Sequence, residues 1–306
     1  MGRQWLWRVA AVGMALVVAL GFSGEPAFAA LGGRVHPVRT PNGHAAHNLR
    51  NQVETANWSG YAVAHFETGK IYTEASATWI VPTVSDAPGF VDSYSSSWVG
   101  IGGFCEDAQC RKVDRTLIQL GTEQDASANG ATAYDAWYEM LPAGPVAIPV
   151  TIHPGDRVTA SLADAPASGT VVHGKPSGPG GPSGKPGGGP GGKVMGQRWT
   201  LIFTDVTTGQ SWMGTFTYNS SLLSAEWIEE APYAGGILPL ADFGTATFDP
   251  GSANGANPLL NTSEGIVMLD PNGQTSNVSV PDSDTDGFDA CWGNGTALTS
   301  CTAPAS

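Results

Sequence analysis

Charged residues are scarce in this chain, and basic residues are the scarcest of them. Only 13% of its 306 residues are charged, and 14 Lys and Arg stand against 27 Asp and Glu, which gives a formal net charge of −13. An acidic surface repels the phosphates of nucleic acids and the headgroups of anionic membranes. We therefore expect neither a nucleic-acid partner nor a membrane partner.

The motifs of the common hydrolases are also missing. The chain has no His-Glu-x-x-His sequence and no Gly-x-Ser-x-Gly sequence, and beyond residue 52 it keeps only His65, His153 and His173. A zinc peptidase needs clustered histidine ligands, and a serine hydrolase needs a histidine beside its nucleophile. Nothing in the sequence near these histidines meets either need, so we expect no metal in the active site and no cofactor.

Long apolar runs are absent except at the N-terminus. Arg3 and Arg8 precede an apolar stretch at residues 9–22, and Ala-Phe-Ala at 27–29 fits the small-x-small pattern of signal-peptide cleavage. No other stretch approaches the ~18 apolar residues of a membrane helix. We predict a signal peptide at residues 1–29 and a basic leader or pro-segment at residues 30–52. The mature protein is expected to be secreted and extracellular.

The four cysteines fall into two local pairs, Cys105 with Cys110 and Cys291 with Cys301. Four cysteines allow three pairings, and an exported chain favours disulfides. A zinc site is the alternative, since Cys-x4-Cys spacing permits it, but no histidine is close to either pair. Two local disulfides are therefore the favoured interpretation.

No stretch has a convincing helical period. Instead, strand-like runs separated by Gly, Pro, Asn and Asp occur at 71–73, 78–81, 98–101, 116–119, 157–162, 199–203 and 265–269. Many short strands without intervening helices indicate a β-sandwich or barrel. We expect one all-β domain at residues 53–306, as a monomer. Residues 174–193, rich in Gly and Pro, are expected to form a disordered surface loop within it.

The most unusual segment is SAEWIEE at 224–230, which places three carboxylates in an aromatic, strand-like run. Acids are rarely buried unless they are paired or functional, although a solvated strand edge is the simpler alternative. Side chains alternate along a strand, so Glu226 and Glu230 share one face but lie ~13 Å apart. They cannot share one water molecule, and a partner for Glu226 must come from another strand.

Gln119 is the candidate partner, because it is a polar amide in the otherwise apolar run 116–119. The alternative is a core-facing amide that is satisfied by backbone groups. A further acidic motif is DSDTDG at 282–287, which begins like a calcium loop. Its twelfth position is Gly293 instead of Glu, and no helices flank it, so a polar turn is favoured over an EF-hand. Whether Asp282, Asp284 and Asp286 bind calcium stays open.

Six segments of the chain occur in an order that resembles the glutamic peptidases, or eqolisins. They are NWSGYA at 57–62, ATWIVP at 77–82, SWVGIGG at 97–103, LIQLG at 117–121, AWYE at 136–139 and AEWI at 225–228. The resemblance implies a β-sandwich of two antiparallel sheets, of the concanavalin or lectin-like jelly-roll kind. It also implies an acid-active endopeptidase that uses a dyad of Gln119 and Glu226. Gly102 departs from the pattern, which usually has an acid there.

In this interpretation Glu226 acts as general base and then general acid on water, and Gln119 stabilises the oxyanion. The residues expected to line the substrate cleft are Trp58, Trp98, Trp137, Tyr138 and Glu139, with ordinary core packing as the alternative for the aromatic ones. The expected partners are protein or peptide substrates.

Two other functions remain open. Ten tryptophans and several acids also suit a carbohydrate-binding sandwich. A glycoside hydrolase is the second, with Glu226 working beside another carboxylate such as Glu139 or Glu123.

Overall fold

The runs of β-branched and aromatic residues fold into strands that neighbouring Gly, Asn and Asp residues terminate. A computed structural model describes residues 46–47, 52–89, 91–165, 196–294 and 300–305. The predicted signal peptide, residues 30–45 and 48–51 of the predicted leader, and the predicted loop at 174–193 lie outside these residues. No helix within the described ranges is long and apolar enough to cross a membrane.

In chain order, the described elements are β1 (Ala46–His47), β2 (Val53–Thr55), β3 (Trp58–Ala64), α1 (His65–Thr68), β4 (Glu74–Ile80), β5 (Ser93–Gly102), β6 (Leu117–Ala126), β7 (Thr132–Met140), β8 (Val146–Thr151), β9 (Arg157–Ala165), β10 (Arg198–Asp205), β11 (Ser211–Thr217), β12 (Ser224–Glu230), β13 (Thr245–Ala253), η2 (Thr262–Glu264), β14 (Gly265–Leu269), β15 (Gln274–Val278) and β16 (Phe288–Asn294).

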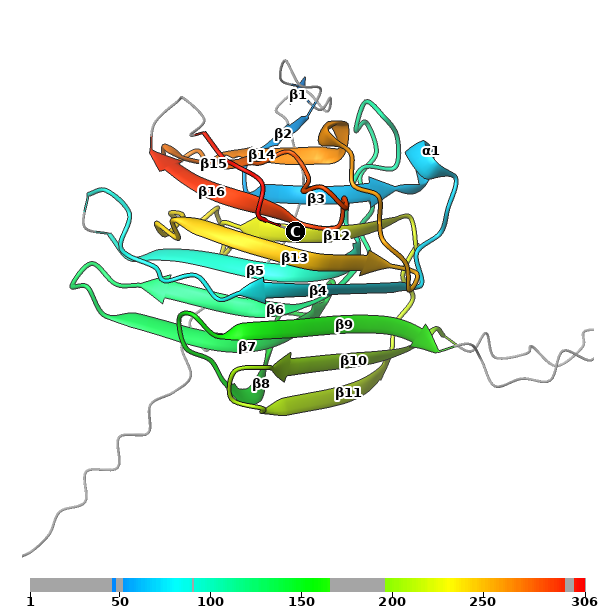
Figure 1. Ribbon diagram of the computed structural model, residues 1–306, viewed down its shortest axis with the longest axis horizontal. Coiled ribbons are helices and arrows are strands. Elements are labelled where there is room, and N and C mark those ends of the chain that lie inside the picture. Colours follow the sequence, from blue (N-terminus) through cyan, green and yellow to red (C-terminus); the bar gives the residue numbers. More distant parts are fainter. Residues whose placement is uncertain (1–45, 48–51, 90, 166–195, 295–299, 306) are drawn as a thin grey trace, which may run out of the picture.

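Hydrogen bonds join the strands into one continuous sheet (Figure 1). Its order is β11-β10-β9-β4-β13-β16-β15-β14-β3-β12-β5-β6-β7-β8, and β2 pairs with β14 and with β1. Every pairing between two of these strands is antiparallel except that of β14 with β2. The all-β prediction is confirmed. Two sheets were expected, and the structure has one. The reason is that β15 pairs with both β14 and β16, and so connects the half of the sheet from β11 to β16 with the half from β14 to β8.

The sheet folds back on itself, so that β4 and β9 lie against β5, β6 and β12. Two indole groups bridge the halves: Trp79 Nε1 donates to Thr122 Oγ1 at 3.1 Å, and Trp227 Nε1 donates to the Ser76 carbonyl at 2.8 Å. The two ends of the strand order also lie against each other. Tyr138 of β7, the strand before the last, stacks on Trp212 of β11, the first strand, with ring centroids 5.4 Å apart. The main hydrophobic core fills the space between the halves and draws residues from both.

One predicted strand is replaced by a loop. Residues 71–73 precede β4, and Ile71 is more than half exposed. The side chain of Asn254 bonds this segment, accepting from the Thr73 amide and donating to the Ile71 carbonyl, both at 2.8 Å. The Thr73 amide and the Ile71 carbonyl therefore bond a side chain, whereas in a strand they would bond the backbone of a neighbouring strand.

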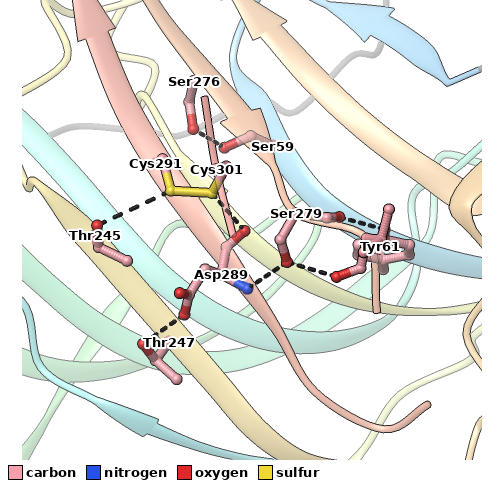
Figure 2. The surroundings of a disulfide bond; sticks show 10 residues. Ser59, Tyr61, Thr245, Thr247, Ser276, Ser279, Asp289, Cys291 and Cys301 are labelled. Carbon is pink, nitrogen blue, oxygen red and sulfur yellow. Dashed lines mark hydrogen bonds between the residues drawn. A yellow bond between two sulfur atoms is a disulfide. The ribbon is translucent and has the colours of Figure 1, made fainter. Parts of the chain in front are cut away.

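Both predicted disulfides are present, Cys105–Cys110 and Cys291–Cys301. Figure 2 shows the second one at the boundary between the two halves of the sheet. Cys301 Sγ contacts the Asp289 carbonyl at 3.2 Å, and Asp289 also accepts from Thr247 Oγ1 at 2.6 Å. The disulfide thus attaches the residues around Cys301 to β16.

Candidate active site

Four residues from four adjacent strands lie in one row across the sheet. Glu226 of β12 pairs with Gly100 of β5, Gly100 pairs with Gln119 of β6, and Gln119 pairs with Glu139 of β7. Residues paired directly across antiparallel strands point to the same face. The register therefore brings the side chains of Glu226, Gln119 and Glu139 to one face, which we call the dyad face.

Gly100 separates the two proposed dyad residues. The Cα atoms of Glu226 and Gln119 are two strand spacings apart, ~10 Å, and the residue between them in the row has no side chain of its own. A β-carbon on Gly100 would lie 2.9 Å from the ring of Trp98 and 3.1 Å from the side chain of Leu117. Glycine is thus required here by close packing. The Trp98 ring and the Leu117 side chain occupy the space over Gly100, between the two polar residues.

Glu226 is completely buried, which is unusual for an acid. Burial raises its pKa well above the usual value of a glutamate, and the charge of Asp114 adds to the rise. Neither carboxylate oxygen accepts a hydrogen bond of ordinary geometry from the described residues, although the neighbouring Ser224 hydroxyl offsets part of the shift. A buried acid whose pKa is raised in this way is a candidate for proton transfer.

Gln119 is oriented by Glu139. Its Nε2 donates to Glu139 Oε2 at 2.5 Å, and both side chains are completely buried. A carboxylate oxygen accepts and does not donate when it is ionised, so this contact defines which end of the amide carries nitrogen. The contact thus holds the amide nitrogen of Gln119 against Glu139.

Three tryptophans lie on the dyad face. Trp58 and Trp98 meet edge to face with centroids 5.0 Å apart, and Trp98 Nε1 donates to Glu230 Oε2 at 2.8 Å. Trp137 pairs with Gly121 of β6 and so points to the dyad face. All three tryptophans are fully buried. Four of the five residues predicted to line a cleft, namely these three and Glu139, therefore share the face of Gln119 and Glu226.

Tyr138 lies elsewhere. It pairs with Leu120, so it points to the opposite face of the sheet, where it contacts Phe216 at a centroid distance of 4.6 Å. The motif AWYE places neighbours 137 and 138 side by side in sequence, and strand alternation sends them to opposite faces. The structure thus places Tyr138 on the face of the sheet opposite Gln119 and Glu226.

Asp114 is a site residue that the sequence did not reveal. It lies in the connection from β5 to β6, is 6% exposed, and accepts hydrogen bonds at Oδ1 from the Thr116 amide and hydroxyl, both at 2.8 Å. Its Oδ2 lies 2.9 Å from the position that a β-carbon would take on Gly102. The acid that the resemblance leads one to expect at residue 102 is therefore supplied nearby by residue 114. No sequence signal links the two positions.

A pocket of about 210 Å³ borders the start of β12. It is lined by Leu223, by His65 and Phe66 of α1, and by Cys105 and Glu106 of the disulfide loop. Leu223 is three residues before Glu226, so this hollow lies beside the strand that carries the candidate base.

A model of the Peptidase A4 family matches residues 56–175 and 195–303, which is most of the chain. The chain belongs to the Peptidase A4 family. This is the family of the glutamic peptidases, or eqolisins, so the resemblance found in the sequence is confirmed. The helix-poor, antiparallel architecture agrees with this assignment.

Individual relatives of this Peptidase A4 member agree with the assignment. The chain is 26% identical over 243 residues to aspergillopepsin-2 of Aspergillus niger, and the match spans 71% of each protein. It is similar to the crystal structure of scytalido-glutamic peptidase with a transition-state analogue inhibitor, with a TM-score of 0.52, 19% identity, and coverage of 78% of this chain and 98% of that one. At this identity, the structural likeness concerns the fold alone.

Proposed function

We propose that this protein is a secreted acid endopeptidase that hydrolyses peptide bonds with Gln119 and Glu226. The observation that carries the proposal is the row Glu226–Gly100–Gln119, which brings a buried acid and an oriented amide to one face of the sheet on either side of a glycine. Membership in the Peptidase A4 family and the signal-peptide pattern of the first 29 residues support it.

The proposed reaction uses one water molecule and one proton carrier. Ionised Glu226 removes a proton from water as the water oxygen bonds to the peptide carbonyl carbon. The carbonyl oxygen becomes an oxyanion, and the side-chain amide of Gln119 donates to it. Glu226 then gives its proton to the nitrogen as the C–N bond breaks, and a carboxylic acid and an amine leave.

Glu139 and the tryptophans have supporting roles in this proposal. Glu139 holds the Gln119 amide in place through the 2.5 Å hydrogen bond, so the amide is oriented before the charge develops. Trp98 and Trp137 give the substrate backbone an apolar surface that excludes water. A peptide in an extended conformation would lie across these strands.

The pKa of Glu226 determines where activity declines in acid. The base form is needed for water attack, so activity falls as pH drops below this pKa. Burial is the largest cause of the raised pKa, and hydration of the face lowers it toward the usual value. We propose an optimum on the acid side of neutrality, reached when water enters the site.

The glycosidase alternative fits this geometry less well. Paired glycosidase carboxylates are ~5 to 9.5 Å apart. Glu139 is three strand spacings from Glu226, ~14 Å between Cα atoms, and its Oε2 is bonded to Gln119. Glu123 lies four residues along β6 from Gln119, which adds ~13 Å along the strand direction.

The direct test is digestion of casein by the purified mature protein from pH 2 to 8, with a soluble polysaccharide as the parallel substrate. We expect casein fragments, with maximal release below pH 7, and an intact polysaccharide. Pepstatin, which mimics the transition state of an aspartate pair, should not inhibit. Polysaccharide cleavage without proteolysis, or maximal proteolysis at neutral pH, would contradict the proposal.

A further inference from the structure

Three carboxylates meet at a point where β13 contacts the loop between β15 and β16. Asp249 comes from β13, and Asp282 and Asp286 come from the DSDTDG loop. Ligand oxygens of all three lie within 4.8 Å of one another. Residues 33 to 37 positions apart in sequence are thus brought together by the fold.

Two oxygens in this cluster are buried without a donor. Asp282 is 6% exposed, and its Oδ1 accepts from the amides of Asp286 and Gly287 at 3.2 Å. Its Oδ2 is shielded from solvent and accepts no hydrogen bond within the described residues, and the same holds for Asp286 Oδ1. A shielded carboxylate oxygen without a donor is costly unless a cation or a proton meets it.

Within the described part of the chain, the carboxylates of this cluster have no ion-pair partner. Among the described residues, no Lys, Arg or His forms an ion pair with Asp249, Asp282 or Asp286. Arg157 is the basic residue beside them, and its guanidinium donates to the Asp249 carbonyl oxygen at 3.4 Å instead of to a carboxylate. Three acids therefore share one small volume with no cation from the protein bonded to their carboxylates.

The separation of the oxygens fits a hard cation of suitable size. Calcium binds oxygen ligands at ~2.3–2.6 Å, so two ligands on opposite sides of one ion are at most ~5 Å apart. Oxygens within 4.8 Å of one another can all reach such an ion. Magnesium needs an octahedron with bonds of only ~2.0–2.1 Å, which is more demanding for ligands from two separate segments.

We propose that Asp249, Asp282 and Asp286 form a calcium site that fastens the β15–β16 loop to β13. The loop is already aligned for this role. The Gly251 amide of β13 donates to the Asp286 carbonyl at 2.8 Å, and Asn257 Nδ2 donates to the Asp284 carbonyl at 2.6 Å. Close packing also requires Gly287, because a β-carbon there would lie 2.7 Å from Asp282 Oδ2.

Calcium at this site is structural and independent of peptide hydrolysis. An ion that binds the folded chain and not the unfolded one raises the melting temperature in proportion to the logarithm of its concentration. At ~100 times the dissociation constant, a protein of this size should gain roughly 5 to 10 °C. Removal of calcium should lower thermal stability and leave the Gln119–Glu226 row unchanged.

The test is calorimetric titration of calcium chloride into the full mature protein at pH 7, after treatment with EDTA and buffer exchange, with thermal unfolding measured in parallel. We expect heat that saturates at one ion per chain and a matching rise in melting temperature. Asp282→Asn keeps an acceptor for the two amides but removes the shielded charge, and Asp286→Asn removes the second ligand. Each should weaken binding at least tenfold.

Asp86→Asn is the matched control, since it removes one negative charge from a half-exposed position outside the cluster. It should bind calcium as the unaltered protein does. Absence of saturable heat and of any thermal shift in the unaltered protein would overturn the proposal. So would retention of full affinity in both Asp282→Asn and Asp286→Asn, or an equal shift with magnesium at the same concentration.

Discussion

Glu226 and Glu229 stand on the same strand, and both are completely buried, yet they face opposite sides of the sheet. Glu226 faces Gly100 and Gln119, where no described residue donates a hydrogen bond of ordinary geometry to it. Glu229 points into the layer between the halves of the sheet, and Ser97 Oγ donates to its Oε2 at 2.5 Å. Burial raises the pKa of Glu229 to about 8, with Ser97 and Ser95 lowering it in part.

The contrast shows that a raised pKa does not identify a catalytic acid. The pKa of both carboxyls is raised for the same first reason, which is loss of water. The two carboxyls differ in the groups that they face. Glu229 meets a hydroxyl and the core, whereas Glu226 shares its face of the sheet with Gly100 and the amide of Gln119. The face of the strand, and not the burial of the acid, separates the structural role from the proposed chemical one.

The largest expected effect is on turnover, and it should separate the two acids. Glu226→Gln keeps the volume but cannot carry a proton, so we expect proteolysis to fall by at least ~10³-fold with little change in melting temperature. Glu229→Gln should keep activity within a few-fold. The measurement is kcat/KM on a peptide substrate at acid pH. Equal losses in the two variants would erase the distinction between the faces.

A second effect concerns the two glutamines of β6. Gln119→Ala removes the proposed oxyanion donor, and a loss of ~10²-fold or more in kcat is expected. Gln124→Ala is the control, because Gln124 bonds Ser95 and Thr122 in the interior. That variant should lower the melting temperature and spare kcat. Near-normal turnover in Gln119→Ala would contradict the proposed oxyanion role.

A third effect is the pH dependence of stability. The pKa of Glu229 is raised from 4.5 to about 8 in the folded chain, so between these values the native state binds more protons than the unfolded state. The free energy of unfolding should therefore be highest at low pH and fall by about 1.4 kcal/mol per pH unit as pH rises toward 8. Glu264, with a pKa raised to about 7 by burial, acts in the same direction.

Denaturant unfolding at pH 4, 6 and 8 measures this slope. At pH 4 the protonated Glu229 resembles glutamine, so Glu229→Gln should match the unaltered protein there and exceed it at pH 8. A slope that is the same in both proteins would show that Glu229 does not titrate in this range.

The smallest expected effect belongs to Asp114. Its charge contributes to the raised pKa of Glu226, after burial, so Asp114→Asn should lower that pKa. The acid limb of the activity profile should then move to lower pH by less than about one unit. Asparagine keeps an acceptor for Thr116, so a uniform loss of activity without a shifted limb would indicate a purely structural role.

Several features were predictable because they depend on local pattern. Alternation along a strand placed Glu226 and Glu230 on one face, and short spacing paired Cys105 with Cys110. The absence of helical periodicity indicated an all-β chain. The ordered motifs around Gln119 and Glu226 identified the family, which the match to Peptidase A4 confirms.

Other features required the tertiary structure, because they depend on register between strands that are distant in sequence. Only the pairing of β5, β6 and β7 reveals that Gln119 bonds Glu139 while Tyr138 turns to the opposite face. Only the path of the β5–β6 connection brings Asp114 beside Gly102.

The carboxylate cluster of Asp249, Asp282 and Asp286 also required the tertiary structure. The sequence pattern DSDTDG contains Asp282 and Asp286 but gives no sign of Asp249, which the fold supplies from β13. A local pattern determines which way a side chain points from its own strand. Which residues lie opposite it is decided by hydrogen bonding between strands, and the alternation along any single strand is the same for every possible register.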